Sequence, residues 1–304
     1  PGGDWWNDNT WYFAWALAAF TVVFGARRLD VSEQHQGMVA AIAFESIIKL
    51  LAFLAVGIFV TYSLFDGMGD IFDRARAVPE IASLFGNAGT FDYGQWFSLT
   101  LLAMLSVVLL PRQFQIMVVE NVDERHLRRA AWVFPAYLLL INIFVLPVAI
   151  GGLLLFGSGT MDPEAFVLSL PLASGQHALA LLAFIGGLSA ATGMVIVESI
   201  AVSSMVCNDL VMPLLLRTRR FGARAHGDLT RLLLGIRRSV IFGIMLLGYS
   251  YFHWAGEAYA LVSIGLISFA AVAQFAPALF GGMYWRGGTR DGAMAGLLLG
   301  FGLW

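Results

Sequence analysis

The stretch GMVAAIAFESIIKLLAFLAVGIFVTYSL, residues 37–64, decides the fold class of this chain. It is longer than the roughly 20 apolar residues that a helix needs to cross the hydrocarbon core of a bilayer. Its charged residues are Glu45 and Lys49, and Lys49 is the only lysine of the whole chain. The stretch therefore predicts a membrane helix that carries a charge pair at depth.

The spacing of Glu45 and Lys49 places both side chains on one helix face, one turn apart. A charge at bilayer depth costs at least about 2.5–3.5 kcal/mol on insertion scales, so such groups usually face a protein interior or a water-filled path. Two interpretations of this buried charge pair stay open. It is either a neutralised pair that locks two helices together or a polar element of a solute or ion pathway.

The composition assigns the whole chain to the membrane class. Of 304 residues, 59% are hydrophobic and only 12% are charged, whereas a soluble domain is about one quarter charged. The single cysteine, Cys207, excludes an internal disulfide. The chain starts with an interfacial, aromatic segment and stops at Trp304 within an apolar run too short to span. We therefore expect both ends to be cut from a longer chain.

Apolar runs predict an all-α polytopic protein with about eight membrane helices, the last one truncated, in a single membrane-embedded domain over 1–304. The predicted spans are approximately 10–26, 37–64, 96–111, 131–157, 176–213, 234–254, 257–285 and 291–304.

Charge in the loops predicts the orientation. Fifteen of the 17 arginines fall in the loops of one side, and the other loops are mainly acidic. The positive-inside rule makes the arginine-rich side cytoplasmic and places the N-terminal end outside. We expect a multi-pass protein of a bacterial inner membrane, with the lipid bilayer and not nucleic acid as the partner of its basic segments.

One outer loop, about 66–95, contains DIFDRARAVPEIASLF (70–85), which has helical periodicity. Pro79 interrupts that pattern and Gly86 closes it. The pattern predicts a short amphipathic helix on the outer surface.

The third predicted span ends abruptly at Pro111, and PRQFQIMVVEN (111–121) then continues with helical character. Proline removes a backbone donor and disfavours helix in the residue before it. Arg112, Gln113 and Gln115 follow the break. This is either a broken helix that exposes backbone groups to a solute or an ordinary helix end with Arg112 as its anchor.

The fifth predicted span is long and polar. Its small residues, Ser189 and Thr192 among them, suit close helix packing. Glu198 and Ser203 add oxygen atoms deeper along the helix, which indicates a candidate cation or proton path. Pairing of Glu198 with Lys49 or with an arginine is the structural alternative.

The sequence contains no recognisable catalytic or metal-binding motif. The five histidines are scattered without metal-ligand spacing, and there is no nucleophile elbow, phosphate loop or cysteine pair. We expect no catalytic site in this chain and no cofactor apart from a coupling ion.

Four stretches together resemble the sodium:solute symporter family, and more narrowly the transporter-like N-terminal region of CbrA-type sensor histidine kinases. They are FGARRLDVSEQHQGMVAAIAFESIIKLLAFLAVG (24–57), PRQFQIMVVENVDERHLRRAAWVFPAYLLLINIFVLPVAIGG (111–152), GLSAATGMVIVESIAVSSMVCNDLVMPLLLR (187–217) and SIGLISFAAVAQFAPALFGGMYWRGGTRDGAMAGLLLG (263–300).

This resemblance implies part of a leucine-transporter-like inverted five-plus-five helix repeat, with the third span as a broken core helix. It also implies binding or transport of a small nutrient such as an amino acid. A histidine kinase beyond Trp304, with its response regulator, would receive the signal. A stand-alone cation-coupled symporter and a receptor that senses without transport are the alternatives.

The chain differs from that family at the two adjacent positions that commonly bind sodium. The family commonly binds sodium with an adjacent Ser-Thr pair, which falls here on Gly193 and Met194. Neither residue offers a side-chain oxygen for sodium. Ser189 and Thr192 could substitute if the register slips. The coupling ion implied is therefore sodium or a proton, the latter through Glu198 or Glu45.

Overall fold

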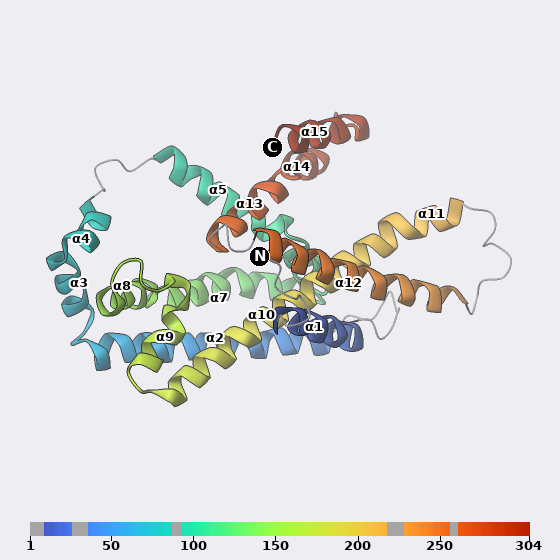
Figure 1. Cartoon of the computed structure of the whole chain (residues 1–304). Coiled ribbons are helices and arrows are strands. Elements are labelled where there is room, and N and C mark those ends of the chain that lie inside the picture. Colours follow the sequence, from blue (N-terminus) through green and yellow to red (C-terminus); the bar gives the residue numbers. More distant parts are fainter. Residues whose placement is uncertain (1–8, 26–35, 87–92, 218–227, 256–260) are drawn as a thin grey trace. The chain divides into compact units, whose positions relative to one another are not determined.

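The computed structural model describes residues 9–25, 36–86, 93–217, 228–255 and 261–304 (Figure 1). All elements in these ranges are helical, as the composition predicts. The α-helices are α1 (Asn9–Gly25), α2 (Gln36–Phe59), α3 (Met68–Ala77), α4 (Pro79–Gly86), α5 (Tyr93–Leu109), α6 (Pro111–Phe114), α7 (Glu124–Asn142), α8 (Val145–Phe156), α9 (Phe166–Ala173), α10 (His177–Met205), α11 (Met212–Arg217), α12 (Asp228–Ala255), α13 (Leu261–Ala273), α14 (Ala276–Tyr284) and α15 (Arg290–Leu303). A 3₁₀ turn covers Pro163–Ala165, and π-helical segments cover Val60–Leu64, Gln115–Val119 and Val206–Val211.

Within the described ranges, five helical stretches are long and apolar enough to cross a membrane, and a bent pair makes a sixth if it is one span. The five are Val39–Leu64, Glu124–Phe156, His177–Leu215, Arg231–Trp254 and Val262–Tyr284. Two of the predicted spans are shorter than a membrane requires, because the apolar helices there cover only Thr10–Val23 and Arg290–Leu303. A polytopic membrane protein is therefore supported, while the first and eighth spans and the inverted repeat stay predictions.

The fourth predicted span begins earlier than expected. Helix α7 starts at Glu124 and not near residue 131, because the side chain of Asp123 accepts a hydrogen bond from the Arg125 backbone N–H at 2.9 Å and caps the helix. Arg128 and Arg129 consequently lie in the first turns of a helix and not in a loop. Of the other predicted cytoplasmic arginines, Arg27, Arg28, Arg219, Arg220 and Arg224 lie outside the described residues.

Backbone contacts divide the chain into two compact units. Unit 1 comprises the described parts of 1–33, 93–119 and 194–304, and unit 2 those of 34–92 and 120–193. Helix α10 starts in unit 2 and ends in unit 1. The single domain inferred from the sequence stays a prediction.

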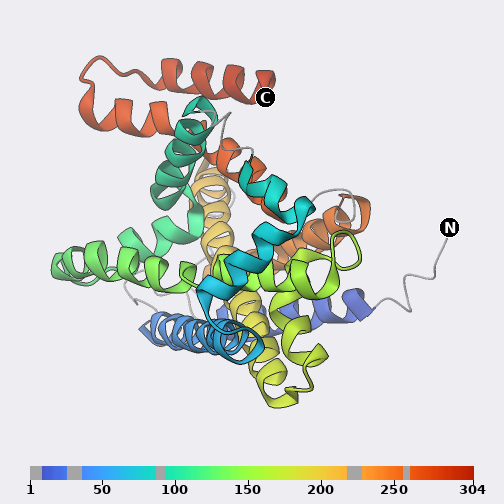
Figure 2. The same cartoon turned by 90° about the vertical axis from the view of Figure 1, so that its left-hand side faces the viewer.

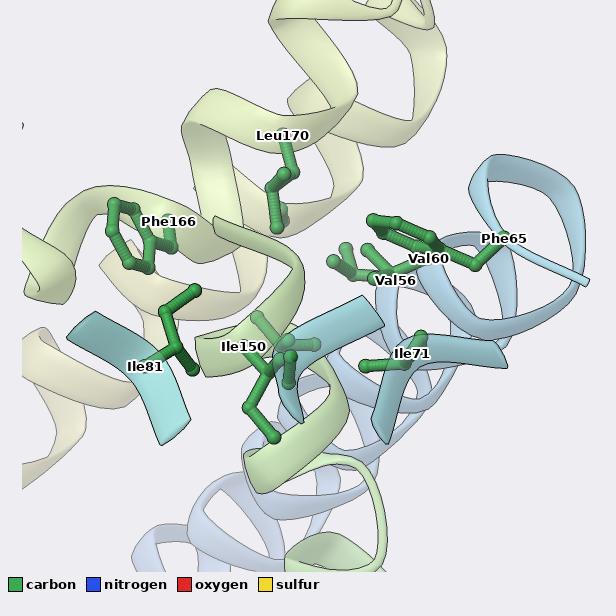
Figure 3. Close-up of a cluster of buried hydrophobic side chains, with 11 residues drawn as sticks. Val56, Val60, Phe65, Ile71, Ile81, Ile150, Phe166 and Leu170 are labelled. Carbon is green, nitrogen blue, oxygen red and sulfur yellow. The ribbon is translucent and has the colours of Figure 1, made fainter. Parts of the chain in front are cut away.

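Unit 2 holds a continuous hydrophobic cluster, which Figure 3 shows. Its members come from α2, the π-helical segment after α2, α3, α4, α8, α9 and α10. They are Val56, Val60, Phe65, Ile71, Ala75, Ile81, Val148, Ile150, Phe166, Leu170 and Ala183. Gly152 of α8 lets the ring of Phe166 approach the helix closely, because a Cβ there would overlap that ring.

The amphipathic segment 70–85 is helical, as its periodicity predicts, but it lies in two helices, α3 and α4, and not in one. Val78 separates them and is extended (ψ 113°), the conformation that a residue before proline prefers. Ile71 and Ala75, one turn apart on α3, are fully buried in the hydrophobic cluster, and α3 packs on α8. The apolar face of α3 is therefore covered by protein, while Leu84 and Phe85 of α4 are exposed.

Unit 1 is built from helix pairs. Helix α13 packs on α5 and α1 packs on α12, while α14 and α15 form the hairpin at the top of Figure 2. Aromatic rings join α1 to α12: the centroids of Trp11 and Tyr249 are 5.0 Å apart, and those of Trp15 and Phe242 are 5.6 Å apart. These ring contacts supply the side-chain packing between α1 and α12.

Candidate solute and ion sites

The third span breaks at Leu110, between α5 and α6. Leu110 is extended (φ −66°, ψ 130°), and the axes before and after it differ by 50°. Pro111 lies in the first turn of α6, where its missing N–H leaves no helical hydrogen bond unmade. The Leu110 carbonyl accepts a hydrogen bond from the Phe114 N–H at 2.9 Å, so the chain resumes as helix at once. The helix then loosens into the π-helical segment Gln115–Val119, a form often found at functional sites.

The polar residues predicted at this break lie partly or fully inside unit 1. Gln115 is 8% exposed, and Arg112 and Gln113 are half-buried. The Nε atom of Arg112 is buried and makes no hydrogen bond within the described part of the chain. A buried guanidinium donor without a partner is costly unless another group satisfies it.

Glu198 on α10 is the acid that the structure brings into the electrostatic range of Arg112. Both residues belong to unit 1, and the positive charge of Arg112 acts on the Glu198 carboxylate. No ion pair within 4.0 Å joins them among the described residues. The attraction therefore acts across a gap and not through a direct hydrogen-bonded pair. Glu198 therefore lies near an arginine of its own unit, and its pairing with Lys49, which belongs to unit 2, stays a prediction.

Two hydroxyl groups of the candidate cation path donate hydrogen bonds to backbone carbonyls of their own helix, α10. Ser203 is 2% exposed and donates to the Ile200 carbonyl at 3.1 Å. Thr192 donates to the carbonyls of Leu188 and Ser189, both at 2.9 Å. Ser189 and Thr192 belong to unit 2, whereas Glu198 and Ser203 belong to unit 1. Within the described residues, no group of three or more His, Cys, Asp or Glu side chains is placed to hold a metal ion.

One arginine near the predicted cytoplasmic side joins two helices of unit 1. Arg237 of α12 donates from Nη2 to the Ser204 hydroxyl of α10 at 2.6 Å. Its position on an apolar helix, six residues inside the span that starts at Arg231, is the signal that could have separated it from the loop arginines.

In unit 2, the carboxylate of Glu45 lies directly against the backbone of Gly193. A Cβ on Gly193 would overlap both carboxylate oxygens. Farther along the same helices, a Cβ on Gly186 would lie 2.7 Å from the Cβ of Ala52. The two contacts are seven residues apart on each helix and in opposite order, so α2 and α10 run antiparallel where they meet. Gly193, one of the two residues that the resemblance aligns with a sodium-binding pair, is thus covered by Glu45, while Met194 beside it is 46% exposed.

Lys49, one turn after Glu45, has no ion pair within 4.0 Å in the part of the chain that the structure describes. It is half-buried and lines a groove of about 370 Å³ in unit 2, together with Glu164. From its sequence context, Glu164 is only one of the acids in the loops opposite the arginine-rich side. Nothing local marks it, because the presence of both residues in one groove depends on how α9 packs on α2 and α8.

Comparisons with protein-family models, with curated proteins and with solved structures found no match for this chain.

Proposed function

We propose that this protein is a membrane module that binds and moves a small solute such as an amino acid and reports it to a histidine kinase. The observation that carries the transport part is the 50° break of an apolar helix at Leu110, with Arg112 beyond the break and Glu198 within its electrostatic range. Broken helices in transporters expose backbone groups and charges to solutes near the bilayer midplane.

The coupling ion in this proposal is a proton and not sodium. Sodium sites need several oxygen ligands, and Gly193 and Met194 stand where the resembled family has its serine and threonine. Glu198 is a carboxylate on a membrane helix, and intramembrane carboxylates often carry protons in pumps and transporters.

The signalling part rests on the resemblance in residues 24–57 and 111–152 to the CbrA-type sensor kinases. It places a phosphoacceptor histidine and an ATP-binding domain in the parent protein after residue 304. A stand-alone symporter is the second function, and autophosphorylation of the parent protein that changes with solute distinguishes the two.

The experiment that tests transport is uptake of labelled amino acids into proteoliposomes, with sodium and proton gradients imposed separately. We expect uptake that follows the proton gradient and is lost in Glu198→Gln, because the amide cannot carry a proton. The matched control is Glu80→Gln, which changes an exposed acid on α4 and should leave uptake unchanged. Uptake that follows the sodium gradient, or solute binding without uptake, would overturn the proposal in favour of a sodium symporter or a receptor.

A further inference from the structure

Arg237 of α12 lies where this helix meets the end of α10 in unit 1. Its Nη2 donates to the Ser204 hydroxyl at 2.6 Å, and its charge reaches the buried thiol of Cys207 in the π-helical segment on which α12 packs. Its Nε atom is buried and makes no hydrogen bond within the described part of the chain. A buried donor of a charged group is costly without an acceptor, so this edge of the guanidinium calls for one.

The described side chains do not neutralise Arg237. No ion pair within 4.0 Å involves it in the part of the chain that the structure describes, and Asp209, the acid of the π-helical segment, is exposed. Arg231 and Arg238 of the same helix are exposed and form no ion pair with a described residue either. Three positive charges near one end of α12 therefore favour an anionic ligand.

The chemistry of the two side chains suits an oxyanion. Nε–H and one Nη2–H of Arg237 point the same way from the planar guanidinium, and two such parallel donors bind two oxygens of one phosphate or carboxylate. The Ser204 hydroxyl accepts from Nη2 and donates to no atom of the described residues. Its hydrogen can therefore make a third contact to the same anion.

The depth of Arg237 selects a lipid phosphate as the occupant. Arg237 follows Arg231, the first residue of its apolar span, by six positions, which is about 9 Å along the helix. Long basic side chains near the ends of a span extend towards the interface, where lipid phosphates lie. The positive-inside rule predicts that this end is cytoplasmic, and basic sites between membrane helices on that side bind the headgroups of anionic lipids. Leu246 and Leu247, farther along α12, are exposed and offer an apolar surface to acyl chains.

We propose that Arg237 and Ser204 form a binding site for the phosphate of an anionic phospholipid. The phosphate oxygens accept from Nε and Nη2 of Arg237 and from the Ser204 hydroxyl. Arg231 and Arg238 attract the net negative charge of the headgroup, and the acyl chains follow the exposed leucines of α12. The site uses neither the broken helix nor Glu198, so the inference goes beyond the proposed function and does not rest on it.

The test is native mass spectrometry of the purified chain in detergent, which resolves the number of bound lipids. The probes are dioleoylphosphatidylglycerol, dioleoylphosphatidylcholine and inorganic phosphate. We expect phosphatidylglycerol to bind more tightly than phosphatidylcholine, whose choline cancels the phosphate charge, and inorganic phosphate at the same concentration not to displace it. Arg237→Gln should weaken phosphatidylglycerol binding about ten- to a hundredfold, and Ser204→Ala about two- to tenfold, because a charged donor contributes more than a neutral one.

Two further variants separate a built site from general attraction of charge. Arg237→Lys keeps the positive charge but not the two parallel donors, so it should also bind phosphatidylglycerol more weakly than the unaltered protein. Arg286→Gln is the matched control, because it removes one exposed arginine of another predicted cytoplasmic loop, and it should bind as the unaltered protein does. If Arg237→Gln does not fold, Arg237→Lys and Ser204→Ala still decide.

Equal phosphatidylglycerol affinity in the variants at 237, in Ser204→Ala and in Arg286→Gln would overturn the inference, because only the total charge would then attract the lipid. Equal affinity for phosphatidylglycerol and phosphatidylcholine would contradict the choice of an anionic lipid. Inorganic phosphate that displaces phosphatidylglycerol, with binding of that phosphate lost in Arg237→Gln, would assign the site to a soluble anion and overturn the lipid as its occupant.

Discussion

Gly193 has no side chain, and the Glu45 carboxylate fills the space that a Cβ at this position would need. Any side chain at 193 would overlap the carboxylate oxygens, so glycine here is a condition for the position of Glu45. By contrast, Gly187 on the same helix has open space where its Cβ would be. The two glycines form a matched pair for experiment.

We expect Gly187→Ala to stabilise the protein by up to about 1 kcal/mol, the ordinary gain of alanine over glycine in a helix. Gly193→Ala should lack that gain, because the Glu45 side chain must leave its position at a cost of about 0.5–1.5 kcal/mol. Adding Glu45→Ala should restore it. Thermal unfolding in detergent of these three variants, of Glu45→Ala alone and of the unaltered protein measures these differences, and equal gains at 187 and 193 would contradict the contact.

Asp70 provides a residue-scale test of pH dependence outside the membrane spans. Its carboxylate accepts a hydrogen bond from Arg74 Nε at 2.8 Å and one from the Asp66 backbone N–H at 3.2 Å, and the Arg74 hydrogen bond in particular lowers the pKa of Asp70. A carboxyl group with a lowered folded-state pKa stabilises the fold above its unfolded-state pKa of about 3.9 and loses that contribution as the pH falls through its folded-state value.

Asp70→Asn should therefore lower the melting temperature of the protein at neutral pH, and the difference should shrink as the pH falls below about 4. Asp73→Asn is the control, because Asp73 and Arg76 form a looser, highly exposed pair at 3.5 Å. Melting curves in detergent from pH 3 to pH 8 measure the effect. A difference between Asp70→Asn and the unaltered protein that grows towards low pH would contradict this assignment.

At the scale of elements, one residue sets the direction of the third span. The extended conformation of Leu110 follows from Pro111, whose ring disfavours helix in the preceding residue. Pro111→Ala removes that constraint and restores a backbone donor, so α5 and α6 should join into a straighter helix.

Spin labels at Thr100 and Val119, both exposed, can measure this change in a background without Cys207. Straightening a 50° bend between them should lengthen the distance by about 3 Å, given a rise of about 1.5 Å per residue. The same variant should lose uptake if the broken helix positions the solute. A control substitution at Ser98, an exposed residue of α5, should change neither quantity.

The elements that the sequence predicted correctly are those with a signal in neighbouring residues. Proline, glycine and apolar-run signals located the discontinuity at Pro111, the helical segment around Pro79 and the long spans, because each of these depends on neighbouring residues. The start of α7 was missed although Asp123 is a good N-cap residue, because hydropathy alone placed the boundary. The π-helical segments have no sequence signal of this kind.

At the scale of the whole molecule, the orientation rests on the distribution of arginines. We expect a cysteine at Asp73 to react with a membrane-impermeant maleimide in intact cells, and one at Arg129 to react only after lysis. Both positions are exposed, and Cys207 is buried. Labelling of the Arg129 position in intact cells would reverse the topology.

The sequence by itself determined the membrane class, the all-α fold, most span positions, the helix break and the list of charges at depth. These follow from hydropathy and local backbone chemistry, which neighbouring residues decide. Only the tertiary structure decided the partners of those charges: Glu45 lies on Gly193, Arg112 acts on Glu198, and Lys49 shares a groove with Glu164. The physical reason is that helix packing joins residues distant in sequence, and the hydropathy of a span does not specify which face meets which neighbour.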